Sequence, residues 1–366
     1  MPGKKNIAIL FQAQKPPIQD GIQKPMKPGG YSDSGADIAF SLKNINLSII
    51  TPVKNPNVKN DYDWVFPDTE NGIQSALDKG ATIFWLNTVL YKNHPIETFF
   101  DGKIEIVGQR PKDVDLFDDK WRTNQLLKEQ NLPIPRAKVF SKKNLKNNKF
   151  DFPFPIVTKP IRGRGSQGVY VAQNQKELCQ LINDLIDSNK YGKEVYIEEY
   201  LSGQEITITV MPPGKYIFTN KEKRIHSYWS LPAIKRFNHH NGIAPYNGTV
   251  AVIENSSILN DDELQQDEIK IVSKHCENAA KIIKAKAPIR IDCRANDKGD
   301  YFIFDLNMKP NMTGSSRPHR KDQDSLTSLA ARKIGWNYEH LLINILEQKW
   351  ITPAANKDGF QQIAGI

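Results

Sequence analysis

The chain has 366 residues, of which 39% are hydrophobic, 25% charged and 9% aromatic, and its formal net charge is +9. This composition is typical of a globular protein and excludes a mainly disordered chain or a collagen-like repeat. The apolar runs are short, well below the ~20 residues that cross a bilayer, so we expect no membrane-embedded protein. At about 150 residues per domain, the length predicts two to three domains.

The N-terminus and the cysteines together predict a cytoplasmic protein with reduced thiols. The apolar stretch 7–11 that follows the basic first residues is too short for a secretory signal. The odd number and wide spacing of Cys179, Cys276 and Cys293 fit neither a disulfide framework nor a metal site. Lysines are spread along the chain among acidic residues, so we predict no nucleic-acid partner, because a basic stripe is the diagnostic sign.

The first third of the chain alternates strands with helices. Strands are predicted at 7–11, 47–53, 81–86 and 104–107, and helices at 34–42 and 73–79. Such alternation favours a parallel sheet, so residues 1–112 are predicted to form an α/β domain. The loop 12–30 holds four prolines and three glycines, and a loop of this length in a compact domain is usually functional or mobile.

Residues 113–203 are predicted to form a small α+β lobe with an antiparallel sheet. A helix over 118–127 ends before Pro133, and a second helix over 175–187 carries its apolar side chains on one face. Strands are predicted at 136–140, 154–159, 169–172 and 194–200.

Residues 204–366 are predicted to form a second lobe. Its expected elements are strands at 205–211 and 216–219, an irregular, basic and histidine-bearing stretch at 221–249, a long helix at 264–285, a strand pair at 290–295 and 301–306, and two C-terminal helices. The paired strands are joined by a polar turn, which indicates a hairpin.

The glycine-rich loop Gly163–Gly168 matches the pattern G-x-G-x-x-G. In a dinucleotide-binding fold this motif opens a helix, but here the strand-forming Val169–Val171 follows it. Between two strands we interpret the loop as a flap whose backbone N–H groups close over phosphates, with a plain glycine hairpin as the alternative. Lys159, at the end of the preceding strand, is then placed to contact phosphate oxygens; otherwise it is a solvated strand end.

Two further groups of polar residues indicate a nucleotide and a metal. Glu198 ends one strand and Glu205 opens the next, which suits an adenine and ribose site, although surface carboxylates serve solvation equally well. Asp292, Asp305 and Asn307 lie in otherwise hydrophobic strands, and their oxygens suit Mg²⁺ held together with substrate phosphates. The alternative for the second group is a charged edge strand.

Taken in chain order, these motifs resemble the ATP-grasp superfamily, in its D-alanine–D-alanine ligase-like branch. The motifs are Asp119-Lys120, Lys159-Pro160, the glycine flap, Glu198 to Glu205, Arg290-x-Asp292, and Asp305-x-Asn307 with Pro310. The resemblance implies an N-terminal parallel α/β domain (1–112) and two lobes with antiparallel sheets (113–203 and 204–366) that sandwich ATP. It also implies an ADP-forming carboxylate–amine ligase that makes an amide through an acylphosphate, in biosynthesis, on small carboxylate and amine substrates that resemble amino acids.

The resemblance assigns a role to single residues. For ATP these are the phosphate lysines Lys120 and Lys159, the flap residues Gly165, Ser166 and Gly168, the adenine segment with Glu198, Tyr200 and Leu201, the ribose ligand Glu205, and a third phosphate contact from Lys235 or Arg236. For two Mg²⁺ ions they are Asp292, Asp305 and Asn307. For the reaction they are Arg290 at the transferring phosphoryl group, the backbone N–H of Asn311 at the oxyanion, and Ser316 at the second substrate's carboxylate, with Arg317 beside it.

The sequence departs from the family where the amino acids bind. The family's His-Gly and Gly-Glu-Asp-Gly motifs are absent from the first domain, and no counterpart is found for the glutamate that meets the first substrate's amine. Asp305 replaces the more usual glutamate, Asn311 a glycine and Arg317 an apolar residue. The ATP machinery therefore looks retained and the amino-acid pockets rebuilt.

Several interpretations stay open at the level of sequence. Arg317, Arg320 and the basic stretch 221–240 suggest a substrate with an extra carboxylate or phosphate, against a solvated basic loop. The role of the histidines in 226–247 is open. A true D-alanine–D-alanine ligase and a non-catalytic ATP-binding module are the alternative functions. Homodimerisation is common in the resembling family, without a sequence signature here.

Overall fold

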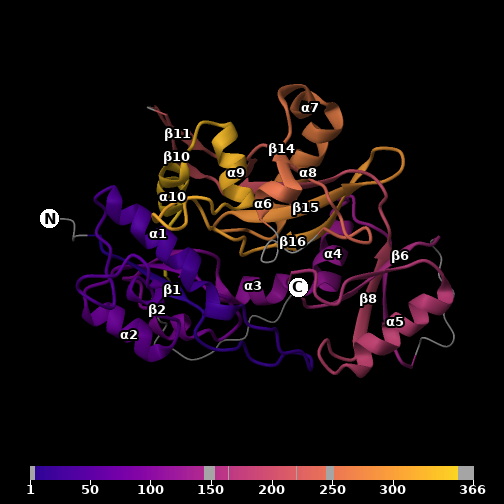
Figure 1. Cartoon of the computed structure of the whole chain (residues 1–366), viewed down its shortest axis with the longest axis horizontal. Helices are drawn as coiled ribbons and strands as arrows, with labels where there is room; N and C mark the ends of the chain where they lie inside the picture. The colour runs from indigo at the N-terminus through magenta and orange to yellow at the C-terminus, as the bar shows by residue number, and fades with distance from the viewer. Residues whose placement is uncertain (1–4, 144–152, 164, 220, 245–250, 353–366) are drawn as a thin grey trace.

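The structure is a computed structural model that describes residues 5–143, 153–163, 165–219, 221–244 and 251–352. A parallel sheet forms the core of its N-terminal domain (Figure 1). Strand β1 (Ile7–Phe11) pairs in parallel with β2 (Phe66–Pro67) and β3 (Ile83–Asn87), and β3 pairs in parallel with β4 (Glu105–Val107). Every residue of β1 and β3 is buried, as expected of parallel strands covered on both faces. Around them lie α1 (Ser32–Asn44), α2 (Glu70–Asp78) and α3 (Pro111–Phe117), at the lower left and centre of Figure 1.

Two details of this domain differ from the prediction. The strand predicted at 47–53 is wrong, because only an isolated bridge joins Ile49 to Ile7, and Pro52 lacks the N–H group that would continue a ladder. Near the other end of the chain, β17 (Trp350–Ile351) pairs antiparallel with β4. The segment that was predicted to end the second lobe thus returns to the first domain.

The central lobe is an antiparallel sheet with one long helix, as predicted. Its strand order is β5-β8-β6-β7, with β5 (Ala137–Ser141), β8 (Glu194–Glu199), β6 (Ile156–Pro160) and β7 (Tyr170–Ala172). Helix α5 (Gln175–Asp187) buries Leu178, Ile182 and Leu185 against this sheet, at the right of Figure 1. Helix α4 (Lys120–Glu129) leads into the lobe and is capped by the Asp119 side chain, which accepts a hydrogen bond from the Arg122 N–H.

The C-terminal lobe is built on a second antiparallel sheet. Its strand order is β14-β13-β9-β15-β16, with β14 (Ser256–Ile258), β13 (Ile234–Arg236), β9 (Glu205–Met211), β15 (Ile289–Ala295) and β16 (Tyr301–Asn307), and β12 (Trp229–Ser230) also pairs with β9. A separate hairpin joins β10 (Gly214–Phe218) to β11 (Lys221–Ile225). The remaining helices are α6 (Val252–Asn255), α7 (Asp261–Gln265), α8 (Asp267–Ile282), α9 (Leu326–Lys333) and α10 (Tyr338–Leu346).

Two predictions for this lobe need correction. The stretch 221–249 is not irregular throughout, because β11, β12 and β13 lie within its described part; residues 245–249 lie outside the described residues. The single helix predicted over 264–285 is divided at Gln266, whose backbone is extended. Helix α7 begins with a capping box of Asn260 and Glu263, so it forms a short helix of its own before α8 starts.

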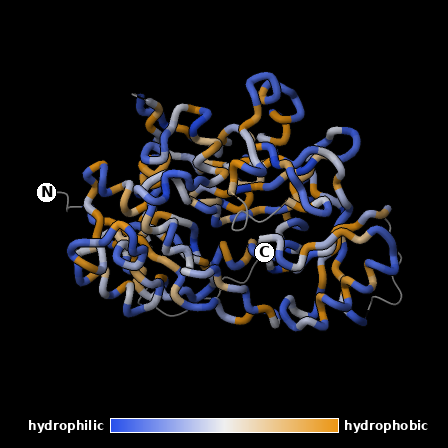
Figure 2. The backbone as a smooth tube through the Cα atoms, viewed as in Figure 1, coloured by the Kyte–Doolittle hydropathy of each residue, from blue (hydrophilic) through white to orange (hydrophobic). Residues whose placement is uncertain are grey.

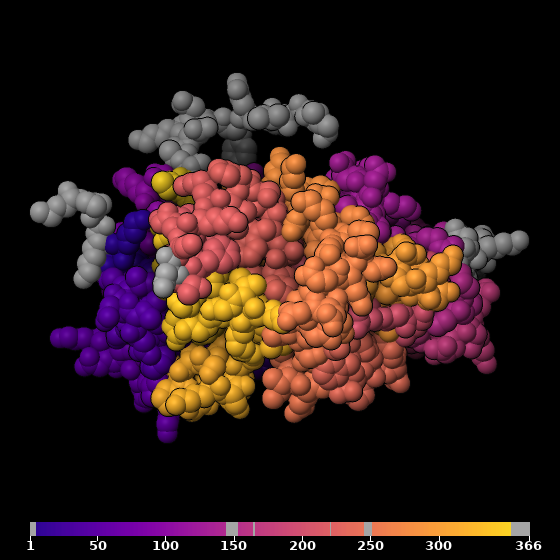
Figure 3. Space-filling view, turned by 90° about the horizontal axis from the view of Figure 1, so that it is seen from above, coloured from indigo at the N-terminus to yellow at the C-terminus, as the bar shows by residue number. Residues whose placement is uncertain are grey.

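The domains pack through apolar side chains. Helix α10 contacts α1 of the N-terminal domain, and one buried cluster contains residues from both, including Ile38, Leu42 and Leu341. Figure 3 shows the C-terminal helices (yellow) beside the N-terminal domain (indigo), and Figure 2 shows hydrophobic residues gathered in the interior. Across the described ranges, no helix is both long and apolar enough to cross a membrane.

Candidate functional site

One face of the C-terminal sheet carries a set of polar side chains. In the register of β15 and β16, Arg290 lies opposite Asn307 and Asp292 lies opposite Asp305. Directly opposite residues, and residues two apart in one strand, share a face, so the four side chains form one group. The opposite face, with Ile291 and Cys293, joins the buried hydrophobic cluster that includes residues of α8.

A β-bulge aims Asp305 at this polar face. Cys293 pairs with Ile303, whereas the next residue back, Asp292, pairs with Asp305, so that Phe304 is an extra residue in β16. Without the bulge, Ile303 and Asp305 would point to the same side, because side chains alternate with a period of two. The bulge lets Ile303 enter the apolar core while Asp305 lines the cavity.

A cavity of about 700 Å³ lies over this face, between the lobes and the N-terminal domain. It is lined by most of the residues that the sequence singled out: Lys120, Lys159, Gly165, Ser166, Glu198, Tyr200, Leu201, Glu205, Arg290, Asp292, Asp305, Asn307 and Asn311. Arg236, Arg294, Lys309 and Tyr31 line it as well. The structure therefore brings together residues that lie about three quarters of the chain apart in sequence, such as Tyr31 and Lys309.

Lys159 and Glu198 form a buried ion pair in the cavity wall. Lys159 Nζ lies 2.7 Å from Glu198 Oε1 and also donates to the Phe304 carbonyl oxygen at 3.0 Å. Only 3% of Lys159 and 4% of Glu198 are exposed. Burial raises the pKa of Glu198, and the positive charge of Lys159 offsets only part of this effect. The lysine thus links the central lobe to the bulge of the C-terminal lobe.

Lys120 forms a second contact between the lobes. It is the first residue of α4, and its ammonium group pairs with the Asp305 carboxylate on β16. Burial alone lowers the pKa of Lys120, but the neighbouring carboxylate reverses the effect and raises it. Burial alone raises the pKa of Asp305, but Lys120 and Lys159 lower it below its usual value. Asp305 therefore carries its charge throughout the neutral range.

Arg290 and Asp292 face each other on β15. The guanidinium donates to Asp292 Oδ1 at 3.2 Å and to Oδ2 at 3.0 Å, and the Thr207 hydroxyl donates to Oδ1 at 2.8 Å. Burial would lower the pKa of Arg290, but Asp292 raises it, so the cation is retained beside the cavity. Thr207, which the sequence did not single out, follows Glu205 on the same face of β9 and fixes the carboxylate.

The donor set of Asp292, Asp305 and Asn307 fits Mg²⁺. Two carboxylates and an amide are hard oxygen donors, and they share one sheet face that borders the cavity. Among the described residues no group of three or more His, Cys, Asp or Glu could hold a metal by itself. This is the arrangement expected where substrate phosphates complete the coordination, because Mg²⁺ is usually bound by one or two carboxylates together with phosphates.

The segment around Glu205 forms the other end of the polar face. His239 Nε2 lies 2.9 Å from Glu205 Oε2, and an Arg294 nitrogen lies 3.8 Å from the same oxygen. Arg294 also lies over the Tyr200 ring, 4.9 Å from its centroid, and donates to the Tyr200 hydroxyl at 3.1 Å. Sequence reasoning missed Arg294, although the alternation of β15 (290, 292, 294) predicts it on this face.

Lys235 does not line the cavity, but its neighbour Arg236 does. In the register of β13, Arg236 lies opposite Glu205 on the polar face, and Lys235 lies opposite Ile206 on the other face. Lys235 Nζ is 3.0 Å from Glu263 of α7. Of the two residues offered for a third phosphate contact, alternation along the strand therefore selects Arg236.

The glycine loop approaches the cavity at its tip. Gly165 and Ser166 line the cavity with positive φ angles of 60° and 58°, and the Ser166 hydroxyl donates to the Ala244 carbonyl at 3.3 Å. Gly168 is not part of the lining; with φ of 73° it lies where a Cβ would come within 3.0 Å of Pro160 and Tyr191. Gly168 therefore allows the tight turn of the loop and does not contact the cavity. Arg164 of this loop lies outside the described residues.

The histidine-bearing loop does not form a metal cluster in its described part. His239 contacts Glu205, whereas His226 and His240 are exposed. Residues 245–247 of this loop lie outside the described residues.

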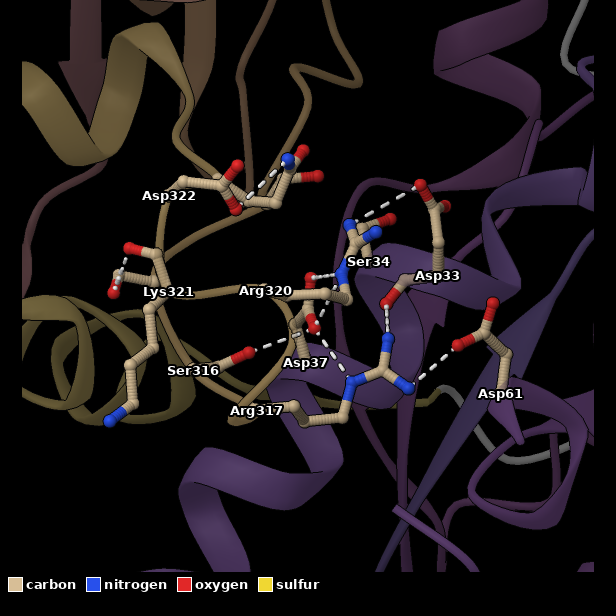
Figure 4. Close-up of polar contacts among 12 residues, drawn as sticks. Asp33, Ser34, Asp37, Asp61, Ser316, Arg317, Arg320, Lys321 and Asp322 are labelled. Carbon is tan, nitrogen blue, oxygen red and sulfur yellow. Dashed lines mark hydrogen bonds and ion pairs between the residues drawn. The ribbon is translucent and has the colours of Figure 1, made fainter. Parts of the chain in front are cut away.

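Ser316 and Arg317 do not line the cavity. The Ser316 hydroxyl donates to Asp37 Oδ1 at 2.8 Å, and Arg317, fully buried, points into the N-terminal domain, as Figure 4 shows. Arg320 also pairs with Asp37. In this arrangement acidic and carbonyl groups of the chain itself take up the donors of Ser316 and Arg317, so the predicted contact with a substrate gains no support here.

The sequence was compared with family models and with known proteins. The sequence model of the family described as "D-ala D-ala ligase C-terminus" matches residues 126–347. The D-alanine–D-alanine ligase of Francisella philomiragia is 25% identical over 245 residues, which cover 67% of this chain and 71% of that ligase. That of Francisella tularensis subsp. novicida is 24% identical over 230 residues, covering 63% and 67%.

Solved structures share the fold over almost the whole chain. The D-alanine–D-alanine ligase of Bacillus anthracis in complex with ATP superposes with a TM-score of 0.59 at 16% identity, covering 94% of this chain and 96% of that one. The VanG D-Ala:D-Ser ligase of Enterococcus faecalis does so with a TM-score of 0.60 at 15% identity, covering 94% and 99%.

Proposed function

The chain belongs to the D-alanine–D-alanine ligase family of ATP-grasp enzymes, which form carbon–nitrogen bonds, and from that premise we propose that it joins two amino-acid-like substrates through an amide bond at the expense of ATP. The observation that carries this proposal is the group of Lys120, Lys159 and Arg290 with Asp292, Asp305 and Asn307 around one cavity. Three cations beside three oxygen donors suit a triphosphate held with a divalent metal.

ATP lies with its adenine against the segment 198–201 and its phosphates toward the polar face of the C-terminal sheet. The Tyr200 hydroxyl is engaged by Arg294, so this segment reads the adenine edge through its backbone groups. Glu205 accepts hydrogen bonds from the ribose. Lys120, Lys159 and Arg236 contact phosphate oxygens, and the tip of the glycine loop closes over them. Lys120 and Lys159 exchange part of their present carboxylate contacts for phosphate when ATP binds.

The reaction has two displacements. A substrate carboxylate oxygen attacks the γ-phosphorus, the bond to the β–γ bridging oxygen breaks, and ADP leaves with that electron pair. The amine of the second substrate then attacks the acyl carbon, and phosphate leaves with one oxygen of the former carboxylate while the amine loses a proton. Arg290 stabilises the charge on the transferring phosphoryl group, and the Asn311 N–H donates to the oxyanion of the tetrahedral intermediate.

Two Mg²⁺ ions are expected at Asp292, Asp305 and Asn307. Bound there, the ions would supply positive charge that neutralises the phosphates and favours transfer of the γ-phosphoryl group. The fixed negative charge of Asp305 and the contact of Thr207 with Asp292 support this assignment.

The substrates belong to the class of small amino acids or amino-acid-like acids and amines. The relatives in the comparison are D-alanine–D-alanine ligases, which makes D-alanine the first compound to test. The first-domain motifs of that branch are missing from this sequence, so we expect a different pair of substrates.

A screen of ADP release with pairs of amino acids, followed by mass spectrometry of the products, tests the proposal. We expect at least one pair, or one amino acid alone, to stimulate ADP release and to yield an amide. Tight ATP binding without ADP release across a broad panel would contradict the proposal and favour a non-catalytic ATP-binding module.

A further inference from the structure

Residues 314–325 connect the region after β16 to helix α9 and have no regular secondary structure. Internal hydrogen bonds shape this connecting segment: the Arg320 N–H donates to the Arg317 carbonyl at 2.8 Å, and the Ser315 hydroxyl donates to the Lys321 carbonyl at 2.6 Å. One side of the connecting segment borders the cavity through Asp322, Gln323 and Asp324.

The other side of the connecting segment is fastened to the N-terminal domain through Arg317. Its guanidinium donates to Asp37 Oδ1 at 2.9 Å, Asp61 Oδ1 at 2.6 Å, the Asp33 carbonyl at 3.1 Å and the Val58 carbonyl at 3.2 Å. All these acceptors belong to α1 or to the stretch just after it, more than 250 positions earlier in the chain. With 0% of the side chain exposed, Arg317 is a contact between domains.

Asp37 of α1 is the centre of this contact. Its carboxylate, 0% exposed, accepts hydrogen bonds from the Ser316 hydroxyl at 2.8 Å, from Arg317 at 2.9 Å and from Arg320 at 2.9 Å. Figure 4 shows these three side chains converging on Asp37 from the connecting segment. Burial raises the pKa of Asp37, and the two guanidinium groups counter this effect. A carboxylate without access to water needs such partners, so losing one of them should loosen the whole contact.

The same contact reaches the opposite wall of the cavity. Arg320 lies 3.5 Å from the Asp33 carboxylate, which is also 2.9 Å from Lys27 Nζ. Lys27, Tyr31 and Asp33 line the cavity together with Asp322, Gln323 and Asp324. The start of α1 and the connecting segment are thus two walls of one end of the cavity, and the Asp37 cluster (Asp37, Ser316, Arg317 and Arg320) lies behind both.

We propose that the Asp37 cluster positions the connecting segment against α1 and so builds the amino-acid end of the cavity. The four residues are positioning residues, because they act through the walls and not through contact with a substrate. Assigning this end to the amino acids rests on the proposed function, whereas the docking of the segment does not. None of the four residues is among those that line the cavity. Substituting them should therefore leave the ATP contacts in place and change only the position of the connecting segment at the amino-acid end.

The first arm of the test needs no substrate. Hydrogen–deuterium exchange of the full chain compares the wild type with Arg317→Met, with the milder Ser316→Ala, and with Lys321→Met. Lys321 is an exposed lysine of the same segment whose side chain points away from the Asp37 cluster (Figure 4), so it is a matched control. We expect exchange in 314–325 to become about ten-fold faster in Arg317→Met and to rise less in Ser316→Ala, because local opening becomes easier. The control and β6–β8 of the central lobe should be unchanged.

Exchange in 314–325 that is unchanged in both variants would overturn the proposal. So would a global loss of protection in Ser316→Ala, which removes a single donor, because the cluster would then support the whole fold and not this segment.

The second arm measures KM with the amino-acid pair that the wild type turns over. We expect Arg317→Met to raise KM for an amino acid at least about five-fold and to leave KM for ATP within about two-fold, with Arg317→Lys recovering part of the loss. Equal changes in both KM values would contradict a positioning role. If the wild type turns over no pair, the proposed function fails, and the exchange arm still decides whether the cluster docks the segment.

Discussion

The two ends of the cavity use their arginines and lysines in opposite ways. At the ATP end, Lys120, Lys159 and Arg290 pair with carboxylates and also line the cavity. At the other end, Arg317 points away from the cavity and forms an ion pair with Asp37 of α1. Arg320 pairs with the same carboxylate. A basic residue beside a motif can therefore bind a ligand only if its N–H donors face the cavity. Whether they do depends on the groups of the folded chain with which that side chain pairs.

The comparison also changes the interpretation of the net charge. The sequence suggested that Arg317 and Arg320 select an acidic substrate. In the structure, Asp33, Asp37 and Asp61 neutralise them. Their role is to hold two domains together, and an acidic substrate no longer follows from them.

The largest expected effect is at the ATP end. Asp305→Ala should lower substrate-dependent ADP release by about 100-fold or more, because it removes a proposed metal ligand and the partner of Lys120. The assay is ADP release at saturating ATP. Asp297→Ala, in the exposed turn between β15 and β16, is the matched control and should keep wild-type activity. Equal activity of the two variants would remove Asp305 from the site.

A smaller effect separates two neighbours on β13. Arg236→Ala should raise KM for ATP by roughly ten-fold, as expected for the loss of one charged hydrogen bond to phosphate. Lys235→Ala should leave KM for ATP within about two-fold, because this side chain lies on the other face of the sheet with Glu263. Initial rates over a range of ATP concentrations measure both values. The reverse ranking would show that the register of β13 is not the one that binds ATP.

The smallest expected effect concerns the pH dependence of stability. The folded-state pKa of Glu198 is raised above its ordinary value, so its ionisation destabilises the fold progressively as pH rises from about 4.5 through that pKa. Glu198→Gln should therefore gain stability relative to the wild type as pH rises through this window. Urea denaturation of both proteins between pH 4 and 8 measures the difference. A difference in the free energy of unfolding that does not vary with pH would contradict the raised pKa.

The sequence predicted much of the ATP end because its signals are local. Alternation along β15 places Arg290 and Asp292 on one face, and the glycine loop, the helix at 175–187 and the strands at 194–199 and 205–211 lie close to where they were expected. These features depend on periodicity over a few residues, which a single sequence contains.

The amino-acid end could not be predicted in the same way. The contact of Arg317 with Asp37 joins residues 280 positions apart, and no local pattern marks it. The bulge at Phe304, which aims Asp305, depends on pairing with β15 and is not visible in the residues of β16 alone. Likewise, β17 joins the first sheet because an edge of β4 is available to it, which is a property of the assembled fold.

Transfer of ¹⁸O tests the central claim most directly. The wild type is incubated with ATP and with amino acids that carry ¹⁸O in their carboxylates, and the phosphate released is analysed by mass spectrometry. Attack of a substrate carboxylate on the γ-phosphorus, followed by amide formation, predicts phosphate that contains one ¹⁸O atom in step with ADP release. ADP release that yields only unlabelled phosphate would contradict an acylphosphate ligase at this site.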